Sequence, residues 1–250
     1  MGRTLGLIGQ FRFAKPGWLA PGPKVTAPVA EGNNPILRFV DLCVSSPNFQ
    51  RRTASNLRER ISRLVWSWVP EFAKLNNEAG LVHGDFGKRN LLLHGDGSLP
   101  VNAVLDWELA VSGSPLTDMG HFLRYETDVR PNYEGLAQNG ARREPVPNPF
   151  GGARRTLCAS KEHAQNGVRR EPVPNPLGGA RRTLGALEPH FSNGYLEAGG
   201  SLPERWREMA RLLDLAGLCE SLTHHELPDD ITAELVELVS ATAWQTGCLD

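Results

Sequence analysis

The segment from Leu81 to Asp118 constrains the fold more than any other part of the chain. It reads LVHGDFGKRNLLLHGDGSLPVNAVLDWELAVSGSPLTD. Apolar residues at 91–93 and 101–105 flank a Gly-Asp-Gly turn, which is a pattern typical of a β-hairpin. We therefore expect two short strands, with a polar loop before the first strand and Asp106 at the end of the second.

Three oxygen-bearing side chains can converge in this arrangement. Asp85 stands at the mouth of the polar loop, Asn90 ends that loop, and Asp106 follows the hairpin. Phosphoryl transfer from a nucleotide requires a carboxylate that orients and deprotonates the attacking hydroxyl, and separate oxygen ligands for Mg²⁺. The spacing H-x-D-x-x-x-x-N, followed after a hairpin by an aspartate, is typical of kinase catalytic segments. Asp85 fits the role of the base, and Asn90 and Asp106 fit the role of metal ligands.

These residues resemble the aminoglycoside phosphotransferase family, which includes choline-kinase-like enzymes. The resemblance rests on His83-Gly84-Asp85 with Asn90, on Asp106-Trp107-Glu108, and on Gly113-Ser114-Pro115 with Asp118. It implies a protein-kinase-like fold with Asp85 and His83 at the catalytic centre, Asp85 being the base, and with Mg²⁺ bound by Asn90 and Asp106. His83 and Asp118 would brace the catalytic loop. The family pattern has an acidic residue at the position of Ser114, so we expect one weaker loop contact here.

The resemblance also implies an activity and its partners. The γ-phosphate of ATP would pass to a hydroxyl of a small molecule, such as an aminoglycoside, an amino alcohol or a sugar-like compound. Lys88 and Asn90 would contact the nucleotide, although an ordinary solvated side chain is the simpler interpretation of Lys88. For His83 a hydrogen bond to the backbone, and for Asp118 a helix cap, are the structural alternatives.

A complete enzyme of this kind also needs a Gly-rich phosphate loop, a strand lysine and a helix glutamate. None of these is recognised in the 82 residues before His83, and the first fifty residues hold no clear series of strands. We therefore expect an α+β, mainly α fold. It would be the C-terminal lobe of a protein-kinase-like fold with a small β-hairpin at the catalytic site, with the N-terminal ATP-grip lobe largely absent. The alternative to an active enzyme is a non-catalytic pseudo-kinase remnant of the same fold.

Three helices are expected outside the catalytic segment. The first spans about residues 56–74, where apolar residues recur at helical spacing: Leu57, Ile61, Leu64, Val65 and Trp68. Ser201 and Glu204 form a capping box for the second helix, with Pro203 in its first turn and an end near residue 223. The third begins near Asp230 and has Leu235, Leu238 and Val239 on one side.

A tandem repeat interrupts the chain. Ala137–Leu157 recurs as Ala164–Leu184 with two differences in 21 positions. Residues 137–186 hold six prolines and seven glycines, a composition that disfavours helix and strand. Two copies are too few for a solenoid, which needs three or more. We expect residues 137–186 to be a disordered insert and residues 1–136 and 187–250 to form one kinase-like domain.

Charge divides the chain in the same way. Residues 137–186 carry nine basic and three acidic side chains, whereas the other 200 residues carry 18 basic and 25 acidic ones. Mobile cations can contact nucleic acid, but a solvated insertion is the simpler interpretation, so we do not expect a nucleic-acid partner. Five acidic residues near the C-terminus would either attract a cationic acceptor or form a solvated helix face: Glu226, Asp229, Asp230, Glu234 and Glu237.

The cysteines and histidines suggest no further site. The four cysteines include no C-x-x-C pair, which argues against a zinc knuckle and a dense disulfide framework. A reducing, cytoplasmic setting is therefore expected, and without a run of 18 apolar residues no membrane partner is expected. Metal binding by His121, His224 and His225 is an alternative, yet adjacent histidines at a helix end are usually ordinary polar residues.

Overall fold

The computed structural model describes residues 1–22, 24–32, 34–93, 101–124 and 187–248. The chain divides into a compact unit of Met1–Arg130 with Thr183–Asp250 and a second unit of Pro131–Arg182. All described residues belong to the first unit. The tandem repeat and the Gly-Asp-Gly turn of the hairpin lie outside the described residues, so what the sequence predicts for them stays a prediction.

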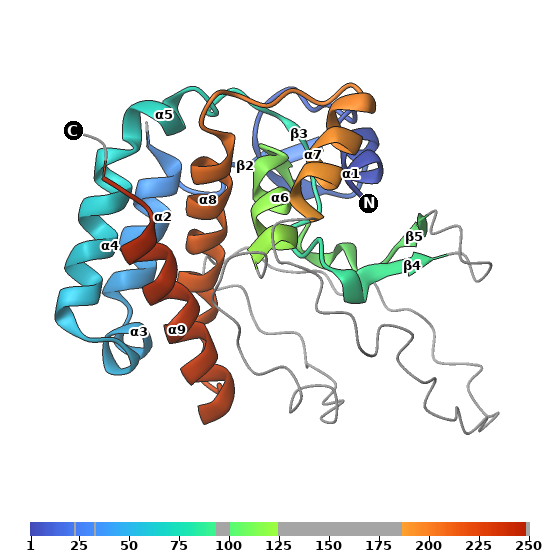
Figure 1. Cartoon of the computed structure of the whole chain (residues 1–250). Helices are drawn as coiled ribbons and strands as arrows, with labels where there is room; N and C mark the ends of the chain where they lie inside the picture. The colour runs from blue at the N-terminus through green and yellow to red at the C-terminus, as the bar shows by residue number, and fades with distance from the viewer. Residues whose placement is uncertain (23, 33, 94–100, 125–186, 249–250) are drawn as a thin grey trace, which may run out of the picture. The chain divides into compact units, whose positions relative to one another are not determined.

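Four helices pack side by side and form a large part of the core (Figure 1). They are α2 (Pro35–Ser45), α4 (Ser55–Ser67), α8 (Trp206–Ser221) and α9 (Asp229–Gln245), and the short helix α3 (Pro47–Arg52) joins α2 to α4. The predicted apolar stripe is confirmed, because all five of its residues are buried: Leu57, Ile61, Leu64, Val65 and Trp68. The last helix is also confirmed, with Leu238 and Val239 in the core.

The single helix predicted over residues 56–74 is wrong, because the structure has two. α4 ends at Ser67 and α5 (Val69–Ala73) begins after Trp68. Pro70 lacks the backbone N–H that a continuous helix would use, and its ring would clash with the preceding turn. Trp68 is fully buried at the break, where its Nε1–H donates to the carbonyl oxygen of Gly247 at 2.9 Å.

The helix predicted after Ser201 begins later than expected. α8 starts at Trp206, so the capping box and the helical position of Pro203 are wrong. Instead, the Trp206 N–H donates to the carbonyl oxygen of Pro203 at 3.1 Å, and the Trp206 side chain is buried. Arg205 places its guanidinium carbon 4.3 Å from the centre of the Trp68 ring. A capping rule takes no account of such a contact with a residue far along the chain.

A four-stranded antiparallel sheet includes the strand that leads into His83 and the loop of Asp85. Its order is β2 (Lys24–Ala27), β1 (Gly17–Ala20), β6 (Val111–Gly113) and β3 (Gly80–Val82). In the first fifty residues, for which the sequence predicts no clear series of strands, the structure has the two short strands β1 and β2. β1 and β2 have four residues each, mostly exposed or half-buried, and β1 pairs with β6 through Trp18 and Val111. Among the described strands, β2 pairs only with β1, its neighbour in the sequence, and strands of four residues leave little local pattern.

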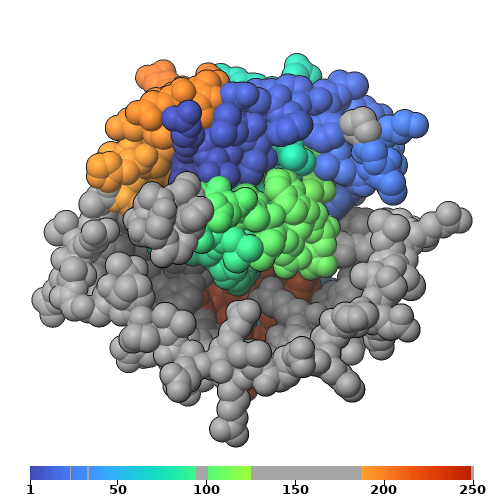
Figure 2. Space-filling view, turned by 90° about the vertical axis from the view of Figure 1, so that its right-hand side faces the viewer, coloured from blue at the N-terminus to red at the C-terminus, as the bar shows by residue number. Residues whose placement is uncertain are grey.

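The remaining elements position the site. β4 (Leu91–Leu93) and β5 (Val101–Val104) pair antiparallel, as predicted, with Leu91 opposite Val104. α6 (Leu116–Leu123) packs on α8, and α1 (Gly2–Ile8) packs on α7 (Leu187–Glu197). Figure 2 shows the dark-blue N-terminal residues beside orange α7, with the green residues of β5, β6 and α6 below them. The described chain is mainly helical with small antiparallel sheets, which confirms the α+β, mainly α class.

The helices place their apolar sides against one another in this core. Within the described ranges, no helix is long and apolar enough to cross a membrane.

Candidate active site

His83 follows β3 and organises the loop that carries Asp85. It is fully buried, its Nδ1 accepts a hydrogen bond from the Asp85 N–H at 3.1 Å, and its Nε2 lies 2.8 Å from the carbonyl oxygen of Leu105. Because Nδ1 accepts, the proton sits on Nε2, which donates to Leu105. His83 therefore ties the Asp85 loop to the residue that follows β5.

Asp118, in the first turn of α6, holds the backbone of the same loop. Its side chain is fully buried, Oδ2 accepts from the His83 N–H at 2.7 Å, and Oδ1 accepts from the Gly84 N–H at 2.8 Å. Burial raises the pKa of Asp118 to about 6, although the two backbone donors and the nearby histidines favour the carboxylate. Both carboxylate oxygens thus fix the backbone at the point where β3 becomes the loop.

Asn90 closes the loop on its other side. It ends a 3₁₀ turn over Lys88–Asn90, is buried, and donates from Nδ2 to the Asp85 carbonyl oxygen at 2.8 Å and to Asp85 Oδ2 at 3.1 Å. Its own carbonyl oxygen accepts from the Leu105 N–H at 2.8 Å. Asn90 therefore connects Asp85 to the hairpin.

Asp106 occupies a left-handed turn directly after β5. With φ 64° and ψ 62°, it is the one non-glycine residue with positive φ in the described part of the chain. It leads into a 3₁₀ turn over Trp107–Leu109, and the Trp107 ring centre lies 4.7 Å from that of His83. Strained backbone of this kind clusters at functional sites. The segments that carry Asp85 and Asp106 therefore contact each other on both sides of Asp106.

Three side chains donate to the Asp85 carboxylate. Arg89 Nη2 lies 2.8 Å from Oδ1 and 2.9 Å from Oδ2, His121 Nε2 lies 3.0 Å from Oδ1, and Asn90 Nδ2 completes the set. Burial alone would raise the pKa of Asp85, but the hydrogen bonds and charges of His121 and Arg89 outweigh it and hold that pKa below its ordinary value. The group therefore stays ionised at neutral pH.

Arg89 and His121 were not predicted as partners of Asp85. Arg89 stands four residues after Asp85, a spacing that could have suggested an ion pair. His121 was considered only as a metal ligand with His224 and His225, and the structure instead pairs His224 with Glu220 at 2.9 Å. The contact between His121 and Asp85 joins α6 to the loop, so no local pattern announces it.

The donor set of Asn90 and Asp106 fits Mg²⁺. The Asn90 amide nitrogen donates to Asp85, so its Oδ1 is the atom that could bind a cation, and the Asp106 carboxylate is exposed. Mg²⁺ in nucleotide sites is commonly held by one or two protein oxygens and by phosphates of the substrate. No cluster of three or more His, Cys, Asp or Glu residues that could hold a metal occurs among the described residues.

Lys88 and Ser114, two further positions of the sequence motifs, make few contacts with described residues. Lys88 is exposed in the 3₁₀ turn and makes no ion pair with a described residue. Ser114, at the position of the family's acidic residue, is buried and accepts from the Leu116 N–H at 3.4 Å, a long hydrogen bond at the start of α6.

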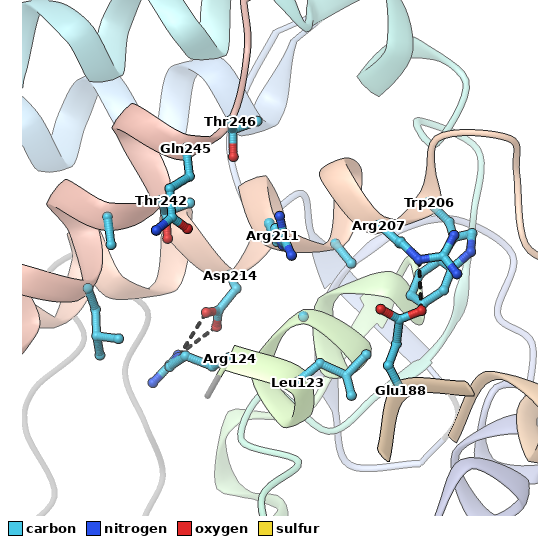
Figure 3. Close-up of a pocket in the computed structure, with 14 residues that line it drawn as sticks. Leu123, Arg124, Glu188, Trp206, Arg207, Arg211, Asp214, Thr242, Gln245 and Thr246 are labelled. Carbon is cyan, nitrogen blue, oxygen red and sulfur yellow. Dashed lines mark hydrogen bonds and ion pairs between the residues drawn. The ribbon is translucent and has the colours of Figure 1, made fainter. Parts of the chain in front are cut away.

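A pocket lies between α6, α7, α8 and α9 (Figure 3). Arg124 and Asp214 form a bidentate ion pair in it, with nitrogen–oxygen distances of 2.6 and 2.8 Å, and Arg207 Nε lies 2.7 Å from Glu188 Oε1. His121 Nδ1 lies 3.9 Å from Asp214 Oδ1, while its Nε2 contacts Asp85. One imidazole ring therefore separates the pocket wall from the Asp85 carboxylate.

A family of known proteins matches this segment. The model of the phosphotransferase enzyme family matches residues 33–152, a range that contains Asp85, Asn90, Asp106 and Asp118. The resemblance inferred from the motifs is thus confirmed. No solved structure matches the chain.

Short regions of curated proteins are also similar. Acyl-CoA dehydrogenase family member 11 of Homo sapiens is 49% identical over 47 residues, which is 19% of this chain and 6% of that protein. Acyl-CoA dehydrogenase family member 10 of Mus musculus is 39% identical over 61 residues, 24% of this chain and 6% of that protein. The chicken member 11 is 29% identical over 90 residues, 32% of this chain and 12% of that protein. This chain therefore spans only a small part of each of these relatives.

Proposed function

From the confirmed resemblance to the phosphotransferase enzyme family, we propose that this chain carries the catalytic residues of an ATP-dependent kinase that acts on a small-molecule hydroxyl. The observation that supports this most is the Asp85 loop. Its carboxylate is held by three side-chain donors, and its backbone is anchored through His83 and Asp118. Proteins catalyse phosphoryl transfer largely by positioning the reacting groups.

Asp85 is the proposed base. Its carboxylate accepts a hydrogen bond from the acceptor hydroxyl and so aims the oxygen at the γ-phosphorus. As the new O–P bond forms, the bond from the γ-phosphorus to the β–γ bridging oxygen breaks, ADP leaves, and the hydroxyl proton passes to Asp85 and then to solvent. Because the pKa of Asp85 is held low, orientation of the hydroxyl is its larger contribution and proton uptake comes late.

Asn90 and Asp106 are the proposed ligands of Mg²⁺. When bound, the ion supplies neutralisation of the negative charge on the phosphates. Asn90 is held against Asp85 by its hydrogen bonds, and the left-handed turn at Asp106 directly follows Leu105, whose backbone contacts His83 and Asn90. His83 and Asp118 keep the loop in place without touching substrate, and exposed Lys88 is available to a phosphate.

The fold belongs to the same proposal. We assign the described helices and the hairpin to the C-terminal lobe of a protein-kinase-like fold, with the nucleotide bound on the side of β4 and β5. A reducing, cytoplasmic setting is also proposed, in line with the free thiols of Cys43, Cys219 and Cys248.

Exchange of the base tests the assignment. Asp85→Asn is expected to lower kcat for ATP-dependent acceptor phosphorylation by about 100- to 10,000-fold, because it removes the base and the charge that orients the hydroxyl. Asp41→Asn on α2 is the matched control, and it should leave kcat unchanged. Thermal unfolding of both variants checks that the fold is retained. Turnover in Asp85→Asn equal to the wild type would show that Asp85 is not the base.

A non-catalytic module is the second candidate. The observation that favours it is the occupation of Asp85 by Arg89, His121 and Asn90, since a fully bonded carboxylate has less capacity for a substrate. Such a module would bind Mg·ATP, measured by calorimetry, but would phosphorylate none of a panel of hydroxyl compounds. An active kinase would do both.

A further inference from the structure

We infer that the acceptor carries an anionic group, a carboxylate or a phosphate, close to the hydroxyl that receives the phosphoryl group. This inference rests on the proposed function and names the class of its substrate. Two observations carry it, one at Asp85 and one in the neighbouring pocket.

The first observation is the contact between the Arg89 guanidinium and the Asp85 carboxylate. Arg89 Nη2 contacts both oxygens of the carboxylate, at 2.8 and 2.9 Å. The Arg89 side chain is 61% exposed, whereas that of Asp85 is 15% exposed. Arg89 therefore covers the carboxylate from the solvent, and Lys88 adds a second exposed cation in the same turn.

Arg89 sets a condition on the acceptor. A hydroxyl can bond to Asp85 only if Arg89 releases or shares a carboxylate oxygen. An acceptor with its own carboxylate or phosphate offers the guanidinium a replacement partner, so the charge-assisted hydrogen bonds are exchanged rather than lost. A cationic acceptor offers no replacement and meets like charge from Arg89 and Lys88.

The second observation is the pocket that the His121 ring separates from Asp85 (Figure 3). Three arginines line it against two carboxylates: Arg124, Arg207 and Arg211 against Glu188 and Asp214. Arg124 is bound to Asp214 and Arg207 to Glu188, whereas Arg211 has no ion pair with any described residue. Among the described residues that line the pocket, there is therefore one cation in excess.

A buried hydroxyl at the same pocket is without a partner. Thr246, at the end of α9, is 3% exposed, and its Oγ1 makes no hydrogen bond, the one such buried side-chain atom among the described residues. In Figure 3 this oxygen points to the side on which Arg211 and Asp214 lie. A hydroxyl donor near an excess arginine suits an oxygen-rich anion.

The acidic residues near the C-terminus do not supply a cation site at this pocket. None of the five carboxylates that the sequence suggested for a cationic acceptor lines the pocket: Glu226, Asp229, Asp230, Glu234 and Glu237. The pocket takes its α9 side chains from the C-terminal half of the helix, from Leu238 to Gln245. Attraction of an amine to the C-terminal region thus has no counterpart at the site.

Four three-carbon compounds test the inference: glycerate, glycerol 3-phosphate, glycerol and 2-amino-1,3-propanediol. Their dissociation constants are measured by calorimetry on the full chain, and their phosphorylation by ATP is measured as kcat/KM. We expect an anionic compound to bind about tenfold more tightly than the amine, the size of one charge-assisted hydrogen bond. Glycerate and glycerol 3-phosphate between them distinguish a carboxylate from a phosphate.

Substitutions test whether Arg89 and Arg211 cause the preference for an anion over the amine. Arg89→Gln and Arg211→Gln should each reduce the difference between anion and amine, whereas Arg63→Gln, an exposed arginine on α4, should leave it unchanged. A preference for the amine, binding of none of the four compounds, or a difference that both variants leave intact would overturn the inference. Arg89-dependent anion binding without phosphorylation would count against the kinase and not against the anion site. Phosphorylation of the amine alone would count against the anion site and not against the kinase.

Discussion

Gly84 allows the backbone before Asp85 to approach the turn that carries Asp106. Its φ is +84°, and a Cβ at this position would lie 2.5 Å from the carbonyl oxygen of Leu109 and 3.0 Å from the Leu109 Cβ. Any other residue would meet both a strained backbone and a steric overlap. The glycine of the His-Gly-Asp motif is therefore required by the contact between two segments.

Replacement of this glycine should cost stability. Gly84→Ala is expected to lower the free energy of unfolding by about 2 kcal/mol or more, measured by urea denaturation, because the left-handed φ and the overlap with Leu109 both oppose it. Gly217→Ala within α8 is the control. Its Cβ meets nothing within 4 Å, so it should raise stability by about 0.5–1 kcal/mol through helix propensity. Equal effects of the two changes would contradict the close approach at Gly84.

Among the elements, α3 is short but holds the end of a long helix. Its last residue, Arg52, donates from Nη1 to the carbonyl oxygens of Leu222 and His224 at 2.7 and 2.6 Å, and from Nη2 to that of His225 at 3.2 Å. Carbonyl groups at a helix C-terminus lack partners within the helix, and a cation there also complements the helix dipole. Arg52 therefore caps α8 from a different part of the chain.

Loss of this cap should be visible in unfolding experiments. Arg52→Met keeps the aliphatic length but leaves three carbonyl groups without the guanidinium, so we expect a loss of about 1–3 kcal/mol in the free energy of unfolding. The neighbouring Arg51 is exposed and contacts only Asn48 on its own helix among the described residues. Arg51→Met should change stability by less than about 0.5 kcal/mol. If both variants unfold alike, the cap does not contribute.

At the scale of the whole molecule, we expect the compact unit to stay folded when the 137–186 insert is removed. Replacement of residues 137–186 by a short Gly-Ser linker is expected to change the free energy of unfolding by about 2 kcal/mol or less, because loop-closure entropy depends weakly on length. Calorimetric unfolding measures this change. Nucleic-acid binding by both forms at several salt concentrations tests the alternative role of the basic insert. A steep salt dependence that disappears with the insert would support that role.

Local patterns account for what could be predicted. Helical periodicity located the buried stripe from Leu57 to Trp68, and the turn and apolar runs located β4 and β5. The break at Trp68 had a local signal too, since Pro70 stood in the predicted helix. β1 pairs locally with β2, but its pairing with β6 joins residues almost a hundred positions apart, and no local pattern announces that contact.

The sequence by itself determined which chemical groups are present and how far apart they stand along the chain, and this was enough for the Asp85, Asn90 and Asp106 motif. Only the tertiary structure decided what surrounds Asp85, because His121 comes from α6 and the Asp214 behind it comes from α8. Contacts between elements depend on how helices pack, and packing is settled by many residues at once. No motif spacing carries that information.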